Sequence, residues 1–399
     1  MWEIFITMEQ TLFLQDRPLC TFSINEKENF TIKKIHESDF NYWPFILQMN
    51  HSPQYLKEWL GNRITQTGRK LLKRIREARK ARGSLGALSL TKGLSLNDCY
   101  WVGNEGESFS DVNLYDNPFS EEIAELAFFP EEKKAAEFAL RSPEYSSYGA
   151  MRKCWIRRDN ILFLMKSDDW PNTDGYNQSI AEYFACQVAN AFGIAYVPYS
   201  LEKRVNSAGK EEIVSLCQIF TSIEKSYVPA RIFFLYKGIE EADLLPTWLE
   251  IPSNLVKLLE QFDAEFYEDM MIFDSLIGNQ DRHLFNFGYY FDSTTNKLLY
   301  PAPVYDNGLS LLAGLANREK YTIDDCLLLN DRGAYLLFDD QCLYFLRERH
   351  FDKILAVANI DIGQDKDIRI EDATLEKINT YLHIRARYAL QMCETKFSK

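Results

Sequence analysis

The stretch GNQDRHLFNFG, residues 278–288, gathers Asp, Arg, His and Asn in one short loop, and YDNG follows at 305–308. Between them, FGYYFD (287–292) and LLYPAPVY (298–305) are apolar runs joined by the polar turn STTNK, so they predict a β-hairpin. Polar clusters are common in loops, and Asn-Gly is a frequent turn signal, so the composition alone proves nothing. The spacing of the acidic and amide residues is what needs a physical explanation.

The spacing of three residues around this hairpin fits phosphoryl transfer from ATP. Such transfer needs a residue that orients the attacking hydroxyl, oxygen ligands for Mg²⁺ and a cation on the phosphates. In protein kinases a catalytic Asp precedes a metal-binding Asn, and a second metal-binding Asp follows the next hairpin. Asp281, Asn286 and Asp306 stand in this order. We therefore predict Asp281, with His283 beside it, as the catalytic residues, and Asn286 with Asp306 as Mg²⁺ ligands.

The region before this loop contains the other groups that a kinase needs, in the expected order. Lys166 ends an apolar, strand-like run, where its ammonium group can reach the α- and β-phosphates. Glu182 lies on the first two turns of a predicted helix, where it can pair with Lys166 and hold it. The strand SLCQIF (215–220) is placed to bind adenine through the backbone around Gln218 and Phe220.

A turn over the phosphates is predicted in EYSSYGAMRK, residues 144–153, which offers one glycine and small residues. Ser147, Gly149 and Ala150 are its candidate ATP contacts. The loop lacks the GxGxxG pattern, so it is a weak signal when it is taken alone.

Each of these residues also has an ordinary structural explanation. A lysine at a strand end is most often a surface charge, and a Glu within an amphipathic helix is usually solvated. A lone histidine such as His283 is more often a structural hydrogen-bonding residue than a base. The ordered set of loop, Lys, Glu, Asp-x4-Asn and Asp favours a kinase-like fold, because few unrelated sequences would provide it.

The apolar pattern of the second part of the chain predicts strands first and helices later. RKCWI (152–156) and ILFLMK (161–166), joined by the polar turn RRDN, are typical of a β-hairpin. The segment 177–193 has helical spacing and ends in glycine, and 213–220 is typical of a further strand. Past residue 225 the helical signal dominates. The expected fold class is α+β, a two-lobed protein-kinase-like fold with a small strand-rich N-lobe, a mainly helical C-lobe and an extra N-terminal subdomain.

The predicted boundaries are 1–140 for the N-terminal subdomain, 141–225 for the kinase N-lobe and 226–399 for the kinase C-lobe. Within the first of these, residues 61–83 carry nine Lys and Arg side chains against one Glu. Their apolar spacing predicts a basic amphipathic helix. That helix either faces the acidic surface of the protein itself or docks an acidic partner.

The composition argues against several other classes of protein. The 399 residues are 46% hydrophobic and 14% aromatic, far more than in a disordered chain. A net charge of −13 disfavours broad binding to nucleic acid. The eight cysteines form no CxxC pair, which suits reduced thiols. The apolar runs are too short to span a bilayer, and the first ten residues lack signal-peptide features. We therefore expect a soluble, cytoplasmic protein.

The segments DSLIGNQDRHLFNFG, YPAPVYDNGLSLL and SSYGAMRKCW resemble the HipA-like serine/threonine kinases. This family is known from bacterial toxin–antitoxin modules and shares a distant fold with phosphatidylinositol kinases. The resemblance covers roughly residues 141–340 and is most specific at 274–310. Arg282 stands where many members have glycine, closer to the Asp-Arg-His order of the lipid kinases. The first 140 residues match no N-terminal subdomain by motif.

The resemblance implies a role for each matched residue. Asp281 becomes the catalytic base, Asn286 and Asp306 become Mg²⁺ ligands, and Lys166 with the loop 146–150 contacts ATP. The resemblance also implies autophosphorylation at the serine three residues before the loop glycine, which is Ser146 in this chain.

As a whole, the resemblance implies an ATP- and Mg²⁺-dependent kinase that transfers the γ-phosphate to a protein hydroxyl, as a toxin directed at a translation component. A separate antitoxin is a possible partner. Two alternatives stay open. One is a lipid or small-molecule kinase, favoured by the Asp-Arg-His order, and the other is a pseudokinase that only binds nucleotide.

Overall fold

The computed structural model describes residues 8–25, 27–65, 88, 91–119, 153–167, 176–205, 211–244 and 257–398. The strands in these residues are β1 (Met8–Leu14), β2 (Arg17–Ile24), β3 (Phe30–Ile35), β4 (Tyr100–Gly103), β5 (Lys153–Arg158), β6 (Ile161–Ser167), β7 (Tyr199–Val205), β8 (Glu211–Gln218), β9 (Lys225–Pro229), β10 (Gly288–Asp292) and β11 (Leu298–Pro301). The helices are η1 (Phe40–Tyr42), α1 (Phe45–Met49), α2 (Pro53–Thr65), α5 (Phe109–Val112), α8 (Gln178–Phe192), α9 (Ala230–Tyr236), α10 (Glu241–Leu244), α12 (Ala264–Ile277), α13 (Ile323–Leu329), α14 (Phe338–Phe345), α15 (His350–Ala358) and α16 (Asp372–Phe397).

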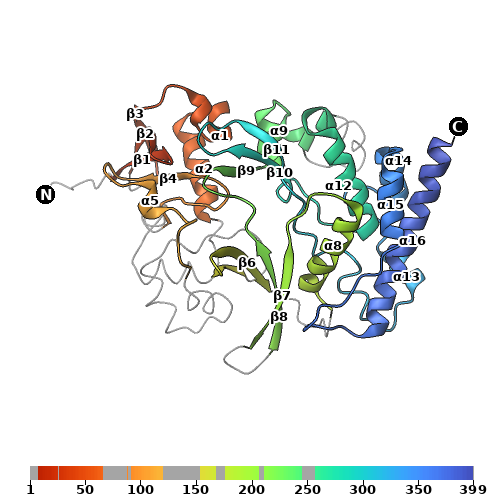
Figure 1. Cartoon of the computed structure of the whole chain (residues 1–399). Coiled ribbons are helices and arrows are strands. Elements are labelled where there is room, and N and C mark those ends of the chain that lie inside the picture. Colours follow the sequence, from red (N-terminus) through yellow and green to blue (C-terminus); the bar gives the residue numbers. More distant parts are fainter. Residues whose placement is uncertain are drawn as a thin grey trace.

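The strands form three antiparallel sheets. Their orders are β3-β2-β1-β4 near the N-terminus, β5-β6-β8-β7 in the middle of the chain and β11-β10-β9 further on. Figure 1 shows α12 to α16 gathered on the side of the molecule away from the N-terminal sheet. Strands therefore dominate the first part of the chain and helices the last part, which confirms the predicted α+β class.

A two-residue turn joins β5 and β6 into a hairpin. Asp159 and Asn160 have φ of 46° and 66°, and they connect Arg158 and Ile161, which face each other across the two strands. Left-handed residues at both central positions give the turn whose twist matches that of the strands, and Asn and Asp tolerate this conformation. The predicted hairpin is confirmed, and its register places Lys166 directly opposite Lys153.

The helix α8 begins and ends where the sequence predicts. The side chain of Asn177 accepts a hydrogen bond from the backbone of Ile180, which satisfies a donor in the first turn. Gly193 ends the helix with φ of 75°, in the left-handed region that favours glycine. Ten residues of α8 are buried, and Glu182 is one of them.

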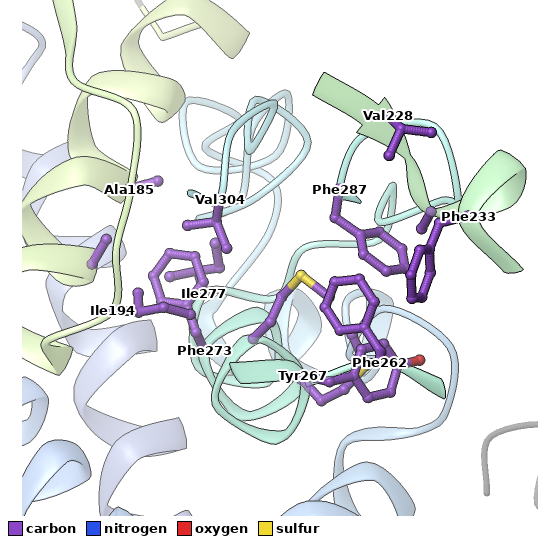
Figure 2. Close-up of a cluster of buried hydrophobic side chains, with 14 of the residues drawn as sticks. Ala185, Ile194, Val228, Phe233, Phe262, Tyr267, Phe273, Ile277, Phe287 and Val304 are labelled. Atoms are coloured by element: carbon purple, nitrogen blue, oxygen red, sulfur yellow. The ribbon is translucent and has the colours of Figure 1, made fainter. Parts of the chain in front are cut away.

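The helix α12 is the centre of the large core. Every residue from Tyr267 to Ile277 is buried, as expected for a helix covered on all sides. Gly278 ends it with φ of 65°, and a Cβ atom there would lie 2.1 Å from the hydroxyl oxygen of Tyr381. The polar loop at 278–288 therefore begins at a fixed position, directly after α12. Figure 2 shows the side chains around this helix, with Phe233, Phe262 and Phe287 on one side and Ile194, Phe273 and Ile277 on the other.

The strand predicted at 298–305 is shorter than expected, because β11 ends at Pro301. Pro301 and Pro303 have no N–H group and cannot donate to a sheet. The chain then leaves β10, and Val304 exchanges backbone hydrogen bonds of 2.9 Å with Ala195 and Val197. This crossing carries the next residues, including Asp306, toward the β5-β6-β8-β7 sheet.

Two other expectations can be compared with the structure only within the described residues. The predicted basic helix at 61–83 overlaps α2 only up to Thr65, and its remainder lies outside the described residues. Within the part of the chain that the structure describes, no helix is both long and apolar enough to cross a membrane.

Candidate active site

Lys166 connects two acidic residues from distant parts of the chain. Its ammonium nitrogen lies 2.7 Å from Oδ1 of Asp306 and 3.6 Å from Oε1 of Glu182. The Lys166 side chain is only 7% exposed, so solvent screens these contacts little. The sequence predicted that Glu182 pairs with Lys166, and the geometry confirms this contact.

The charges of this cluster shift one another's protonation. Burial would lower the pKa of Lys166, but Asp306 and Glu182 raise it above its ordinary value. The surrounding protein, which covers Asp306 only in part, would raise its pKa, but the ammonium of Lys166 holds this pKa below its ordinary value, with smaller help from Lys153 and Arg282. The lysine is therefore cationic and Asp306 is ionised at neutral pH.

Glu182 differs from its partners. Burial raises its pKa to about 7, even though Lys166 opposes this shift. Its second oxygen, Oε2, accepts a 2.7 Å hydrogen bond from the backbone of Asn307. Glu182 therefore holds the lysine and also fixes the chain just after Asp306.

Asp306 has a backbone conformation suited to its position. Its φ is 60°, in the left-handed region that Asp adopts more easily than most residues. Its N–H group donates to the hydroxyl oxygen of Tyr199 at 3.2 Å. The side chain is 40% exposed, so its carboxylate can reach a ligand while it contacts Lys166.

A buried arginine organises the polar loop at 278–288, where the catalytic residues are predicted. Arg282 donates to both oxygens of Asp274 at 2.9 and 3.0 Å, and both side chains are fully buried. Its other hydrogen bonds join the catalytic loop to the segment around Asp306, at the backbone oxygens of Asn286 and Tyr305 and at Oδ1 of Asn307. All these partners belong to the protein, so the Asp-Arg-His order gives no separate reason to favour a lipid substrate.

The side chain of Asn286 closes the loop onto itself. Its amide donates to the backbone oxygen of Asp281 at 2.6 Å, and its Oδ1 accepts from the backbone of His283 at 3.0 Å. Nδ1 of His283 accepts from the backbone of Phe285 at 3.2 Å, which leaves only Nε2 for a reactant. Asp281 and His283 are exposed, whereas Asn286 is buried.

This arrangement fits a magnesium ion that is completed by phosphate and water oxygens. Asp281 is exposed as a residue, but the protein around its carboxyl group partly removes water and raises its pKa, and the negative charge of Asp306 raises this pKa further against the opposing effect of His283. A cation between the two carboxylates would relieve this repulsion. Oδ1 of Asn286 keeps a second lone pair for a metal. Among the described residues no group of three or more His, Cys, Asp and Glu side chains could hold a metal by itself. Mg²⁺ commonly uses only one or two carboxylates together with substrate phosphates.

The predicted adenine-binding segment, residues 215–220, covers the end of β8 and the two residues after it. Gln218 ends β8, where its N–H group donates to the backbone oxygen of Pro198 at 3.4 Å. The backbone oxygen of Phe220 already accepts from the hydroxyl of Tyr290 at 2.8 Å. The ring of Phe220 lies 5.0 Å from that of Tyr305, just before Asp306. Adenine binding at Gln218 and Phe220 stays a prediction.

Four predicted residues lie outside the described residues, namely Ser146, Ser147, Gly149 and Ala150. Two further contributors were not predicted: the hydroxyl of Tyr199 accepts from the backbone of Asp306, and the backbone of Asn307 donates to Glu182. No local pattern indicated them, because both depend on contacts across more than a hundred residues.

Part of the chain is similar in sequence to a known protein kinase. No protein-family model matches the chain. Over 172 residues the chain is 26% identical to the serine/threonine-protein kinase CtkA of Helicobacter pylori strain J99, which covers 38% of this chain. The match spans about half (48%) of the length of that relative.

Two solved structures are similar in shape. The HipA protein of Shewanella oneidensis MR-1, solved with HipB and operator DNA, has a TM-score of 0.53 at 14% identity. The match covers 98% of this chain and 99% of that one. The crystal structure of the Helicobacter pylori proinflammatory kinase CtkA has a TM-score of 0.46 at 20% identity, covering 64% of this chain and 94% of that one. The HipA comparison confirms the kinase-like fold and extends the resemblance to the N-terminal region that matched no motif.

Proposed function

We propose that the chain is an ATP- and Mg²⁺-dependent serine/threonine protein kinase of the HipA-like class. The observation that carries the proposal is the meeting of Lys166 with Asp306 and Glu182 at 2.7 and 3.6 Å. The catalytic loop with Asp281 is tied to the same segment through Arg282. The partial sequence similarity to a serine/threonine-protein kinase supports this proposal.

Each residue has a definite task in this proposal. Mg²⁺ on ATP would neutralise negative charge on the transferred phosphoryl group, and Asp306 and Asn286 would hold it. Lys166 binds phosphate oxygens while Glu182 keeps its ammonium group in place. Asp281 accepts the proton of the acceptor hydroxyl. The raised pKa of Asp281 makes it a better base than an ordinary aspartate, because base strength increases with pKa.

The proposal also includes the partners that the family resemblance implies. The partners are a protein substrate among the translation components and a separate antitoxin. The proposal further includes a cytoplasmic location and self-limitation through phosphorylation of Ser146. The similar HipA structure was solved with HipB and operator DNA, which supports including an antitoxin.

A labelling experiment tests the proposed activity against its alternatives. The protein is incubated with Mg²⁺ and ATP labelled at the γ-phosphate, together with separate protein and lipid extracts. We expect label on protein, and no transfer when EDTA removes Mg²⁺. Label on lipid alone would favour the lipid kinase, and nucleotide binding without any transfer would favour the pseudokinase.

A further inference from the structure

Phe285 carries an exposed aromatic ring in the same loop as the proposed catalytic base. Phe285 follows Asp281 by four positions, and its residue is 41% exposed. The next two residues, Asn286 and Phe287, are each only 1% exposed. Single exposed apolar residues are normal on protein surfaces, so exposure alone would not assign a role. The way this ring is held is more informative.

The backbone of Phe285 is fixed on both sides. Its N–H group donates to Nδ1 of His283 at 3.2 Å, and its backbone oxygen accepts from the hydroxyl of Tyr305 at 3.0 Å. Because Asn286 bonds the backbone oxygen of Asp281 at 2.6 Å, the loop folds back toward the base. The loop backbone around Phe285 is thus fixed, as a pre-organised binding site requires, and the Phe285 ring lies 6.1 Å from the ring of His283, which is predicted as a catalytic residue together with Asp281.

The helix α9 supports the same ring. The backbone of Arg231 donates to the oxygen of Leu284 at 3.0 Å, and its guanidinium carbon lies 5.8 Å from the centre of the Phe285 ring. That distance allows a cation–π interaction, which further restricts the ring. The Arg231 guanidinium also pairs with the carboxylate of Glu241. The pair has no net charge. This surface therefore suits an apolar residue of the substrate, next to the residue that is phosphorylated, rather than an acidic residue.

We propose that Phe285 forms a subsite for the protein substrate. This subsite selects a serine or threonine that has a large apolar residue one or two positions before or after it. The inference rests on the proposed kinase function and specifies the substrate class of that site. Successive residues of an extended peptide are about 3.3 Å apart, so a side chain one or two positions from the hydroxyl can reach a neighbouring ring. Phe285 is therefore a specificity residue, and it takes no part in the proton transfer.

A degenerate peptide mixture with one fixed serine tests the proposal. The wild type should enrich large apolar residues within two positions of the serine. In Phe285→Ala, kcat/KM for an apolar-flanked peptide should fall about tenfold, mainly through KM, because buried apolar area is lost. KM for ATP should stay unchanged, and Phe285→Leu should restore part of the preference. The control is Tyr388→Ala, which removes another exposed aromatic ring from α16 (45% exposed) and should leave the preference intact.

A second variant probes the charge of the subsite. Arg231→Gln leaves the Glu241 carboxylate without its partner, so selection should shift toward basic flanking residues. An unchanged apolar preference in Phe285→Ala, or a wild-type preference for acidic flanks, would overturn the subsite while leaving the kinase proposal standing. Failure of the wild type to phosphorylate any peptide or protein in Mg-ATP would overturn the kinase proposal itself, and the subsite with it.

Discussion

The ammonium nitrogen of Lys166 lies 2.7 Å from Oδ1 of Asp306, although the two residues are 140 positions apart. The contact joins the strand β6 to the segment that follows β11. It brings together the residue predicted to bind phosphate and the residue predicted to bind Mg²⁺. Both proposed ligands would therefore meet at one pair of side chains, which would link the affinity for metal to the affinity for nucleotide.

The first prediction concerns metal-dependent nucleotide binding. Asp306→Asn should remove most of the stabilisation that Mg-ATP gives to wild type, because a carboxylate ligand is lost. Thermal unfolding with and without Mg-ATP measures the effect. The control is Asp292→Asn, which changes an aspartate in the β10–β11 turn. An Mg-ATP shift in Asp306→Asn equal to that of the wild type would contradict the assignment.

The second prediction concerns pH. Burial raises the pKa of Glu182 from 4.5 to about 7. A carboxyl with a raised pKa stabilises the folded state at low pH, and this contribution is lost as the pH rises from about 4.5 through about 7. Glu182→Gln cannot ionise, so its unfolding temperature should fall less over this range than that of the wild type. Parallel curves for the two proteins would show that Glu182 keeps an ordinary pKa.

The third prediction concerns the buried pair of Arg282 and Asp274. Arg282→Met leaves the Asp274 carboxylate uncompensated and should cost about 3–5 kcal/mol of unfolding free energy. Adding Asp274→Asn should recover a substantial part of that loss, because the buried charge is gone. The exposed pair of Arg17 and Glu37 is the control, and Arg17→Met should cost less than about 1 kcal/mol. Denaturant unfolding measures these three variants together with Asp274→Asn alone. Purely additive losses for Arg282 and Asp274 would contradict the coupling.

The fourth prediction concerns Ser146. Slow autophosphorylation there should add about −1.5 to −2 charges at neutral pH, and this charge would repel the triphosphate of ATP. Intact-mass and peptide mapping after incubation with Mg-ATP measure the modification, with Ser147 as the alternative position. The modified protein should bind ATP more weakly. A wild-type protein that stays unmodified while it phosphorylates another substrate would exclude this self-limitation.

Local signals made part of the fold predictable. The Asp159–Asn160 turn requires a left-handed backbone that these residue types accept, so the hairpin could be inferred from the sequence. The helix ending at Gly193 was equally clear, because glycine commonly stops helices. The strand after residue 298 was predicted too long. Pro301 and Pro303 were visible and could have indicated where β11 ends.

The interior of the site could not be predicted in the same way. The order of Lys166, Glu182 and Asp306 suggested their meeting, and the structure brings them together. The role of Arg282 was hidden, because its partners come from α12 and from the segment 305–307. A charged side chain inside a largely apolar region indicates buried partners only after the tertiary contacts are known.

The role proposed for Asp281 is to accept the proton of a protein hydroxyl during phosphoryl transfer. The most direct measurement compares labelled phosphate transferred from Mg-ATP to protein by wild type and by Asp281→Ala, with nucleotide binding followed in parallel. We expect Asp281→Ala to bind Mg-ATP nearly as well as wild type but to transfer phosphate at least about a hundredfold more slowly. Near-normal transfer by Asp281→Ala would contradict it.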